Sequence, residues 1–376
     1  MNRGAWLNMD ESVASQLVPA SEIRENGGKR RPRLLLIQPL VGIGDMIWHK
    51  PWIDHLAAHY DVILATKPTV NARLLFDGDY AIADFLMIER SMRGKRGKHD
   101  GLIGFFRMVA DFRAVKADLC LVLHHSARYT LATRMAGIPE RWGYGIGSSA
   151  RWLNRGRFLG GDARYQHPSA KMADFAAMNG FAPEKAVWRI RSTPQGIAGT
   201  TEFLRRHNID DAQPICPLIS IGVGAMDEER LWPAANFSRL IAMMSDQFPD
   251  VSFALVGSPD ELALMEFVMS DLPDAKRALI VSGSLDMAVE VMRRSLLFVG
   301  NDSGLLNIAA ACERPAIGLF AQSSPLDYNP NIKAVTVPDG RFGVPGHINT
   351  ITPDQVFDVV KRELAGVTDV ACHGTK

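Results

Sequence analysis

Residues 296–311 read LLFVGNDSGLLNIAAA, and this stretch holds the pattern on which the fold prediction rests. Four apolar residues come first, Leu296–Val299, and an uninterrupted apolar run predicts a strand that is buried on both faces. A short polar loop follows, and the apolar residues after Gly304 continue as a helix predicted over 303–312. A strand that leads through a tight loop into a helix is half of a parallel βαβ unit.

The same alternation of strand and helix fills both halves of the chain. It predicts an α/β protein with two Rossmann-like, doubly wound domains, whose ligands would bind in a central cleft at the carboxyl ends of the strands. The first half has predicted strands at 34–37, 61–65, 84–88 and 118–123, and helices at 46–59, 101–115 and 127–136. The second half has predicted strands at 218–222, 252–256, 279–281, 296–299 and 316–319, and helices at 234–247, 260–270, 286–295 and 303–312.

Composition and periodicity give the expected domain limits. A polar tail over 1–30 has no sustained period, and a proline-containing, weakly periodic segment over 183–214 is the expected linker. We therefore expect domains over 31–190 and 191–352, followed by a C-terminal helix and tail over 353–376.

Charge and cysteine usage exclude several classes of protein. The 42 basic and 41 acidic residues leave a net charge of 42 − 41 = +1, which argues against a dedicated nucleic-acid binder. No apolar run approaches the roughly 20 residues of a membrane span, and the N-terminus lacks the apolar core of a signal peptide. We expect a cytoplasmic protein.

Its widely spaced cysteines fit neither disulfides nor zinc and are expected to be reduced: Cys120, Cys216, Cys312 and Cys372.

Two loops could carry chemistry, one after the strand predicted at 34–37 and one after the strand predicted at 296–299. In the loop 301–304, Asp302 or Ser303 can cap the following helix, whose N-terminus suits a phosphate, although an ordinary capped loop explains the same residues. In GIGD, residues 42–45, the third glycine of a dinucleotide fingerprint is replaced by Ile47. Asp45 is then either a general base or a helix cap.

Three charged segments are further candidates for a functional role. Arg230, just before Trp232-Pro233, is either a phosphate ligand or part of a solvated loop. Asp77-Gly78-Asp79 resembles a metal-binding D-x-D, but a turn explains it better. The run 90–98 with the nearby Phe105 and Phe106 suits a polyanionic or membrane-surface partner, or is a solvated loop. His124-His125 lacks a third ligand, so no metal site is predicted.

Together these motifs resemble glycosyltransferase family 9, the ADP-heptose:lipopolysaccharide heptosyltransferases of GT-B fold. The resemblance runs from about Leu34 to about Pro330. Its elements are Gly44-Asp45 with Pro51, the segment 118–145, Arg230–Pro233 with Phe237, the turn 256–261, and 299–304 with Ala309–Ala311 and Pro315. The sequence departs from the family pattern at Asn307 (usually His), at Arg230 (usually Lys) and at 320–325, which read FAQSSP.

The resemblance implies an inverting, metal-independent sugar transfer without a cofactor, from an ADP-sugar to an acceptor hydroxyl. It implies that Asp45 is the base and that Arg230 stabilises the leaving diphosphate. The implied donor-binding residues are Gly44, Gly224, Arg230, Glu261, Asp302, Ser303, Gly304 and Asn307. The N-terminal domain would bind an anionic, lipid-linked or glycan acceptor at the inner membrane face, through Arg93, Lys95, Arg96, His125 and Arg128.

Other readings stay open at this point. The donor could be another nucleotide sugar, and the acceptor a protein or small molecule. Alternatively, the chain could be a catalytically silent GT-B protein, which the change at Asn307 favours and the retained Asp45 opposes. A dinucleotide-dependent oxidoreductase is disfavoured by the missing glycine.

Overall fold

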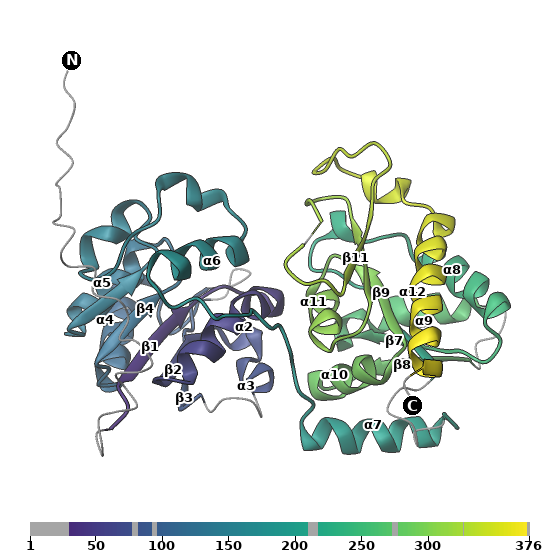
Figure 1. The fold of residues 1–376 in the computed structure, drawn as a ribbon, viewed down its shortest axis with the longest axis horizontal. Coiled ribbons are helices and arrows are strands. Elements are labelled where there is room, and N and C mark those ends of the chain that lie inside the picture. Colours follow the sequence, from purple (N-terminus) through teal and green to yellow (C-terminus); the bar gives the residue numbers. More distant parts are fainter. Residues whose placement is uncertain are drawn as a thin grey trace. The chain divides into compact units, whose positions relative to one another are not determined.

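A computed structural model describes residues 30–76, 82–91, 96–209, 217–272, 277–325 and 327–373, with side chains described as far as residue 365. Asp77-Gly78-Asp79, Arg93, Lys95, Cys216 and the side chain of Cys372 fall outside these residues. The predicted α/β class is confirmed, because the chain forms two wholly parallel sheets, with helices between successive strands except between the last two, 316–320 and 332–336 (Figure 1).

The chain forms two compact units. The first holds the described residues up to Val41, His49–Val70 and those from Tyr80 to Ala186. The second holds Gly42–Trp48, the described residues from Asn71 to Asp79, and those from Val187 onward. The first six residues of the first helix, 43–48, therefore group with the second unit.

The first unit contains a five-stranded sheet in the order β3-β2-β1-β4-β5. Apolar strand residues such as Leu35, which is paired with Ile63 and Cys120, are buried, as the apolar runs predict. Its strands are β1 (Arg33–Gln38), β2 (Asp61–Thr66), β3 (Asp84–Met87), β4 (Leu119–Val122) and β5 (Glu140–Gly143). Its α-helices are α2 (Ile43–Ala57), of which residues 43–48 belong to the second unit, α4 (Gly101–Ala114), α5 (Ala127–Met135) and α6 (Pro168–Met178).

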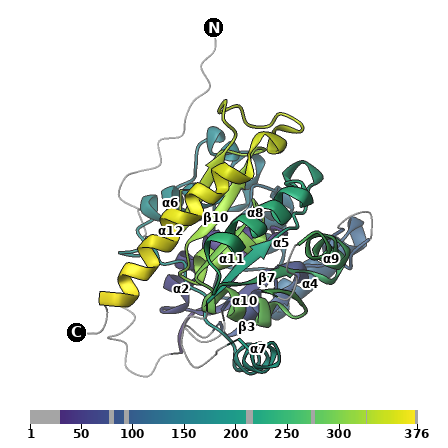
Figure 2. The same cartoon turned by 90° about the vertical axis from the view of Figure 1, so that its right-hand side faces the viewer.

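The second unit contains a six-stranded sheet in the order β11-β10-β9-β6-β7-β8, and the strand order reverses between β6 and β9. Helix α12 packs against α8, and α10 packs against α7 and α11 (Figure 2). Its strands are β6 (Leu218–Gly222), β7 (Ser252–Gly257), β8 (Ala278–Ser282), β9 (Leu297–Asn301), β10 (Ala316–Phe320) and β11 (Ile332–Thr336). Its α-helices are α3 (Ala72–Leu75), α7 (Pro194–Arg206), α8 (Ala234–Gln247), α9 (Leu262–Ser270), α10 (Leu285–Arg294), α11 (Gly304–Ala311) and α12 (Pro353–His373).

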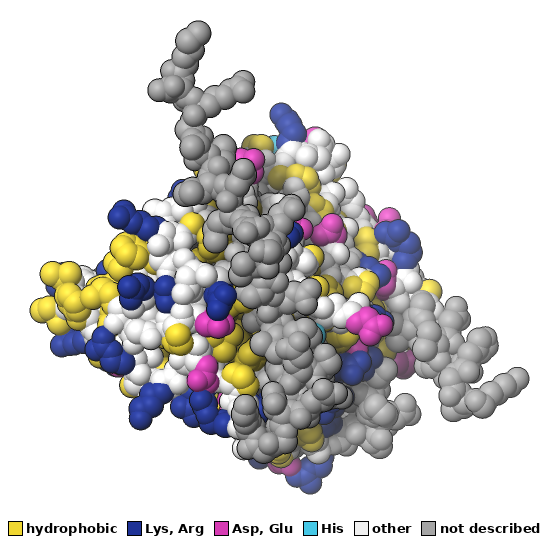
Figure 3. Space-filling view, turned by 60° about the vertical axis from the view of Figure 1, so that its left-hand side comes forward, with side chains coloured by type: hydrophobic (Ala, Val, Ile, Leu, Met, Phe, Trp, Pro, Cys, Tyr) yellow, Lys and Arg dark blue, Asp and Glu magenta, His cyan; other side chains and the backbone are white. Residues whose placement is uncertain are grey.

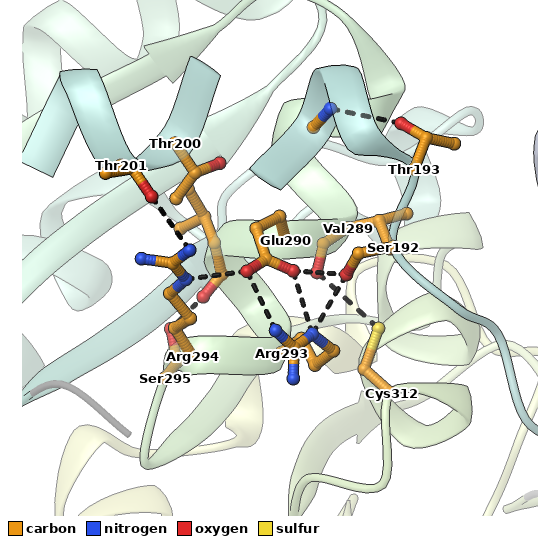
Figure 4. Close-up of polar contacts among 12 residues, drawn as sticks. Ser192, Thr193, Thr200, Thr201, Val289, Glu290, Arg293, Arg294, Ser295 and Cys312 are labelled. Atoms are coloured by element: carbon orange, nitrogen blue, oxygen red, sulfur yellow. Dashed lines mark hydrogen bonds and ion pairs between the residues drawn. The ribbon is translucent and has the colours of Figure 1, made fainter. Parts of the chain in front are cut away.

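A buried carboxylate fastens α7 to α10 (Figure 4). Glu290 is fully buried and accepts hydrogen bonds from Ser192 Oγ, from Arg293 Nε at 2.8 Å and from Arg294 Nε at 2.6 Å. Arg294 Nη2 also donates to Thr201 Oγ1 at 2.9 Å. Burial acts to raise the pKa of Glu290, but hydrogen bonds from Arg293, Ser192 and Arg294 outweigh it, so the pKa lies below its usual range. We call these five residues the Glu290 cluster.

The structure corrects one expectation about organisation and adds elements to it. The segment 183–214 is not all linker, since it contains α7, which begins with the N-cap Thr193 and Pro194 and is bonded to α10 through Thr201. Strands β5 and β11 and helix α6 were not predicted. Cys120 and Cys312 are buried and free, as expected, and burial raises the pKa of each thiol to about 12. No described helix is long and apolar enough to span a membrane.

Candidate functional site

The loop after β9 is organised by a buried amide. Asn301 Nδ2 donates to the Val223 carbonyl oxygen at 2.8 Å, and Asn301 Oδ1 accepts from the Trp232 backbone N–H at 3.0 Å. The side chain thus joins the loops that follow β9 and β6 to the segment that leads into α8. Sequence reasoning gave Asn301 no role, because its partners lie about seventy residues earlier in the chain.

Asp302 and Arg230 are brought together at this loop. Arg230 Nη1 donates to Asp302 Oδ2 at 3.2 Å, and Ser323 Oγ donates to the same oxygen at 2.8 Å. Arg230 Nε also lies 3.4 Å from Asp227 Oδ2. The Arg230 side chain is 36% exposed whereas that of Asp302 is 11% exposed, so the guanidinium lies at the open edge of the site. Ser323 is a member that the sequence did not reveal.

Ser303 occupies the N-cap position of α11 without capping it. The residue is extended, its side chain makes no cap hydrogen bond, and its buried Oγ has no partner among the described residues. Asp302 instead bonds to Arg230 and Ser323, so the prediction that Asp302 or Ser303 caps this helix is wrong. The hydroxyl and the first N–H groups of α11 are left for a ligand, and a helix N-terminus favours an anion.

Asn307 is a buried connector. Its Oδ1 accepts from Trp48 Nε1 at 2.9 Å and from the Tyr328 hydroxyl at 2.6 Å, and its Nδ2 donates to the Ser303 carbonyl oxygen at 2.9 Å. The indole N–H can only donate, which fixes the amide oxygen toward Trp48. Asn307 therefore holds α11 and Tyr328 against Trp48, in the second turn of α2. Neither Trp48 nor Tyr328 was predicted from the sequence.

Gly44 and Asp45 lie in the first turn of α2. Asp45 Oδ2 accepts from the Gly42 backbone N–H at 2.8 Å. Asp45 is the third residue of α2 and not its N-cap, so it satisfies the start of the helix from inside the first turn, as the acidic residue of a capping box does. A Cβ atom at position 44 would lie 3.0 Å from Asn307 Nδ2, which explains why glycine suits this position. Asp45 thus lies one residue from the contact with Asn307, within the second unit; its role as a base stays a prediction.

Glu261 and Gly224 form a second close contact. Glu261 Oε2 accepts from the Ser258 backbone N–H at 2.7 Å in a capping box. A Cβ atom at position 224 would lie only 1.7 Å from Glu261 Oε1, so only glycine leaves room for this carboxylate. The carboxylate is thereby fixed beside the loop that follows β6.

Arg128, in the first unit, braces the start of α4. Its Nη2 donates to the carbonyl oxygens of His99 at 2.9 Å and Gly101 at 2.7 Å, and its guanidinium lies over the Phe105 ring at 4.9 Å. Its buried Nε has no hydrogen-bond partner among the described residues. Arg96 is exposed.

His125 belongs to an electropositive group at the carboxyl ends of β2 and β4. The His124 and His125 rings stack at 4.5 Å. Burial, then His125, Arg90, Lys171 and Lys67, lower the pKa of His124 to about 3. Burial, then Arg164 and Lys171, also lower the pKa of His125. We call Lys67, Arg90, His124, His125 and Lys171 the His124 group; the sequence did not indicate Lys67 or Lys171, which lie far apart along the chain.

Among the described residues, no group of three or more His, Cys, Asp or Glu side chains is placed to hold a metal ion. The candidate donor-side residues therefore offer an arginine, a free hydroxyl and a helix N-terminus as their ligands for an anion. Such groups bind phosphate through charge-assisted hydrogen bonds.

Comparison with solved structures confirms the GT-B fold. A glycosyltransferase of family 9 from Veillonella parvula superposes with a TM-score of 0.73 at 16% identity, over 89% of this chain and 97% of that one. The ADP-heptose lipopolysaccharide heptosyltransferase II of E. coli superposes with a TM-score of 0.68 at 20% identity, over 89% and 99%.

Comparison with sequences places the chain in a family. Lipopolysaccharide heptosyltransferase 2 of Escherichia coli is 26% identical over 58% of this chain, and lipooligosaccharide heptosyltransferase 2 of Haemophilus influenzae is 33% identical over 30% of it. The matches span 63% and 34% of those relatives' lengths. The model of glycosyltransferase family 9 (heptosyltransferase) matches residues 105–339, more than half of the sequence. The chain therefore belongs to glycosyltransferase family 9.

Proposed function

We propose that this protein transfers a heptose, or a similar sugar, from an ADP-sugar to a hydroxyl of a lipopolysaccharide-core-type acceptor, with inversion at the anomeric carbon. One observation carries the proposal: the Ser303 hydroxyl at the N-terminus of α11 is without a partner in the part of the chain that the structure describes, and Arg230 lies at the edge of the same loop. Family membership and the heptosyltransferase names of its relatives support the choice of sugar.

On the donor side, the diphosphate would lie on Ser303, Gly304 and the first N–H groups of α11. Arg230 would turn from Asp302 toward the phosphates, which leaves the Asp302 carboxylate for sugar hydroxyls. Glu261 would bind the ribose. An E. coli heptosyltransferase has been solved with ADP-2-deoxy-2-fluoro heptose, which supports an adenine nucleotide as the first donor to test.

The chemistry divides between a base and a charge stabiliser. Asp45 takes the proton of the acceptor hydroxyl, and the oxygen lone pair forms the new bond to the anomeric carbon. The bond from that carbon to the diphosphate oxygen breaks, and its electron pair leaves with ADP. Arg230 and the α11 N-terminus stabilise the charge that develops there, the role that a metal ion serves in other transferases.

On the acceptor side, we propose that the His124 group, Arg128 and Arg96 bind an anionic acceptor. Lys67 and Lys171 are each only 9% exposed, and Lys171 Nζ donates to the Arg164 carbonyl oxygen at 3.3 Å. Such buried cations favour a phosphate or carboxylate as their partner. We place the reaction in the cytoplasm, at the inner face of the membrane where a lipid-linked acceptor would lie.

The proposal is tested by ligand binding followed by turnover. We expect ADP to raise the melting temperature more than UDP, GDP or NAD, because saturating ligand at a hundred times its Kd adds about 2.7 kcal/mol. ADP-heptose with a lipopolysaccharide-core acceptor should then give product and ADP, with no loss of rate in EDTA. Stabilisation by UDP or GDP alone would reject the donor, and stabilisation without turnover on any acceptor would identify a binding protein.

A further inference from the structure

Helix α4 has apolar side chains on both of its faces. The inner side chains Phe105, Met108 and Phe112 are buried against the first unit's core. On the outer face Leu102, Ile103 and Phe106 are 74%, 72% and 52% exposed. A surface helix normally places polar residues on its outer side, and a concentrated apolar patch there marks an interaction surface. We call these three side chains the α4 patch.

The charges around the α4 patch are positive. Arg107 and Arg113 are exposed on the same helix, and Arg96 is exposed just before it. Arg113 Nη2 donates to the Met135 carbonyl oxygen at 2.7 Å, which leaves its charge unneutralised. Figure 3 shows hydrophobic side chains gathered beside Lys and Arg side chains at the left of the view.

The acidic groups nearest in sequence are already engaged. Asp100 accepts from the backbone N–H groups of Ser91 and Gly97, and Asp111 accepts from Lys98 Nζ and His99 Nε2. They are the only acidic residues between 96 and 114. The outer face of α4 therefore offers apolar surface and positive charge without a free carboxylate.

We propose that the α4 patch inserts into the interfacial region of an anionic lipid bilayer, with Arg107 and Arg113 contacting the headgroups. Apolar side chains flanked by cations are the combination that binds anionic membranes. The cations disfavour a second copy of this chain as the occupant, because a symmetric contact would place them against one another.

The α4 patch is also joined to the candidate acceptor side. Arg128 bonds to the carbonyl oxygen of Gly101, the residue at which α4 begins. This inference rests on the proposed function, since a lipid-linked acceptor gives the contact its purpose. Lipid binding can nevertheless be measured without donor or acceptor.

The test uses the full chain with vesicles of mixed phosphatidylglycerol and phosphatidylcholine. We expect it to sediment with these vesicles at low salt, more weakly at high salt, and not with phosphatidylcholine alone. The triple variant Leu102→Ser, Ile103→Ser, Phe106→Ser should lose roughly tenfold or more of the vesicle affinity. The matched control, Leu262→Ser with Phe267→Ser on α9, removes side chains that are 38% and 53% exposed and should bind as the parent does.

Two readouts keep the test independent of folding defects. Phe106→Trp should add fluorescence that shifts to shorter wavelength with anionic vesicles, and Arg107→Gln with Arg113→Gln should weaken binding and its salt dependence. Unchanged binding by the triple variant, or an unshifted Trp signal, overturns the inference. Self-association that the triple variant abolishes, without vesicle binding, overturns it in favour of a second copy.

The two proposals fail differently. Transfer to a delipidated acceptor without vesicle binding rejects only the α4 patch. Vesicle binding without transfer to any acceptor rejects only the proposed function.

Discussion

Two polar clusters of the second unit contain the same kinds of side chain and differ in how completely they are paired. In the Glu290 cluster, a buried carboxylate has two arginines and a serine as partners, and the serine accepts from Arg293 as well. At the loop after β9, Asp302 has one arginine and one serine, Arg230 is partly exposed, and Ser303 Oγ has no described partner. Complete pairing indicates a structural role, and incomplete pairing indicates a place for a ligand.

The largest expected effect tests whether Asp45 serves chemistry or only capping. Asp45→Asn keeps an oxygen that can accept from the Gly42 N–H, so the fold and ADP binding should persist. Transfer should fall by about 10²–10⁴-fold, because a general base is lost. Steady-state kinetics with saturating donor measure this, and near-normal turnover would leave Asp45 as a cap alone.

The Glu290 cluster should affect stability rather than chemistry. Glu290→Ala leaves Arg293 and Arg294 without their carboxylate partner and beside a cavity. It should lower the free energy of unfolding by about 3–5 kcal/mol. Urea denaturation measures the loss. The pKa of Glu290 is lowered in the folded protein, so its contribution is present above the unfolded pKa and disappears as the pH falls through the folded value. A variant as stable as the parent would contradict the structural role.

Arg230, unlike the Glu290 cluster, should affect ligand binding and turnover rather than stability. Arg230→Ala should weaken ADP binding and lower kcat by about tenfold or more, since the departing diphosphate gains charge, with little change in melting temperature. Arg230→Lys should be milder without being neutral, because bidentate contact is lost. Calorimetry that finds unchanged ADP affinity in Arg230→Ala would remove Arg230 from the donor site.

The two serines form a matched pair for the same comparison. Ser303→Ala removes a hydroxyl that has no described partner, so stability should hold while ADP affinity falls by about tenfold, the value of a hydrogen bond to a charged group. Ser192→Ala removes a partner of Glu290 and should cost about 1 kcal/mol of stability without changing ADP affinity. If the two variants changed stability and ADP affinity equally, the distinction between a structural cluster and a ligand-binding loop would be wrong.

The last comparison concerns the His124 group of the first unit, whose effect is confined to acidic pH. Because the pKa of His124 is lowered to about 3, the unfolded chain binds more protons between about pH 6.5 and 3. The folded state should therefore lose stability as the pH falls from 6.5, by on the order of 1–2 kcal/mol near pH 5. His124→Asn should flatten this part of the melting-temperature profile, and a profile identical to the parent's would exclude His124 as its source.

The sequence by itself determined the fold class and the position of the loop between β9 and α11. Strands buried on both faces need continuous apolar runs, which made 34–37, 218–222 and 296–299 recognisable. Strand β5 (Glu140–Gly143) is short and includes Glu140 and Arg141, and β11 (Ile332–Thr336) includes Lys333, so neither has such a run. Asp302, Ser303 and Arg230 could be chosen as candidates because each belongs to a short local motif, and their roles in donor binding stay predictions.

Only the tertiary structure decided how these motifs are completed. Ser323 reaches Asp302 from 21 residues away, and Trp48 reaches Asn307 from 259 residues away. The space for Glu261 depends on the missing Cβ of Gly224, which lies on another strand's loop. Local sequence determines backbone conformation through periodicity and turn chemistry, whereas partners of this kind depend on which strand ends the parallel sheet brings together.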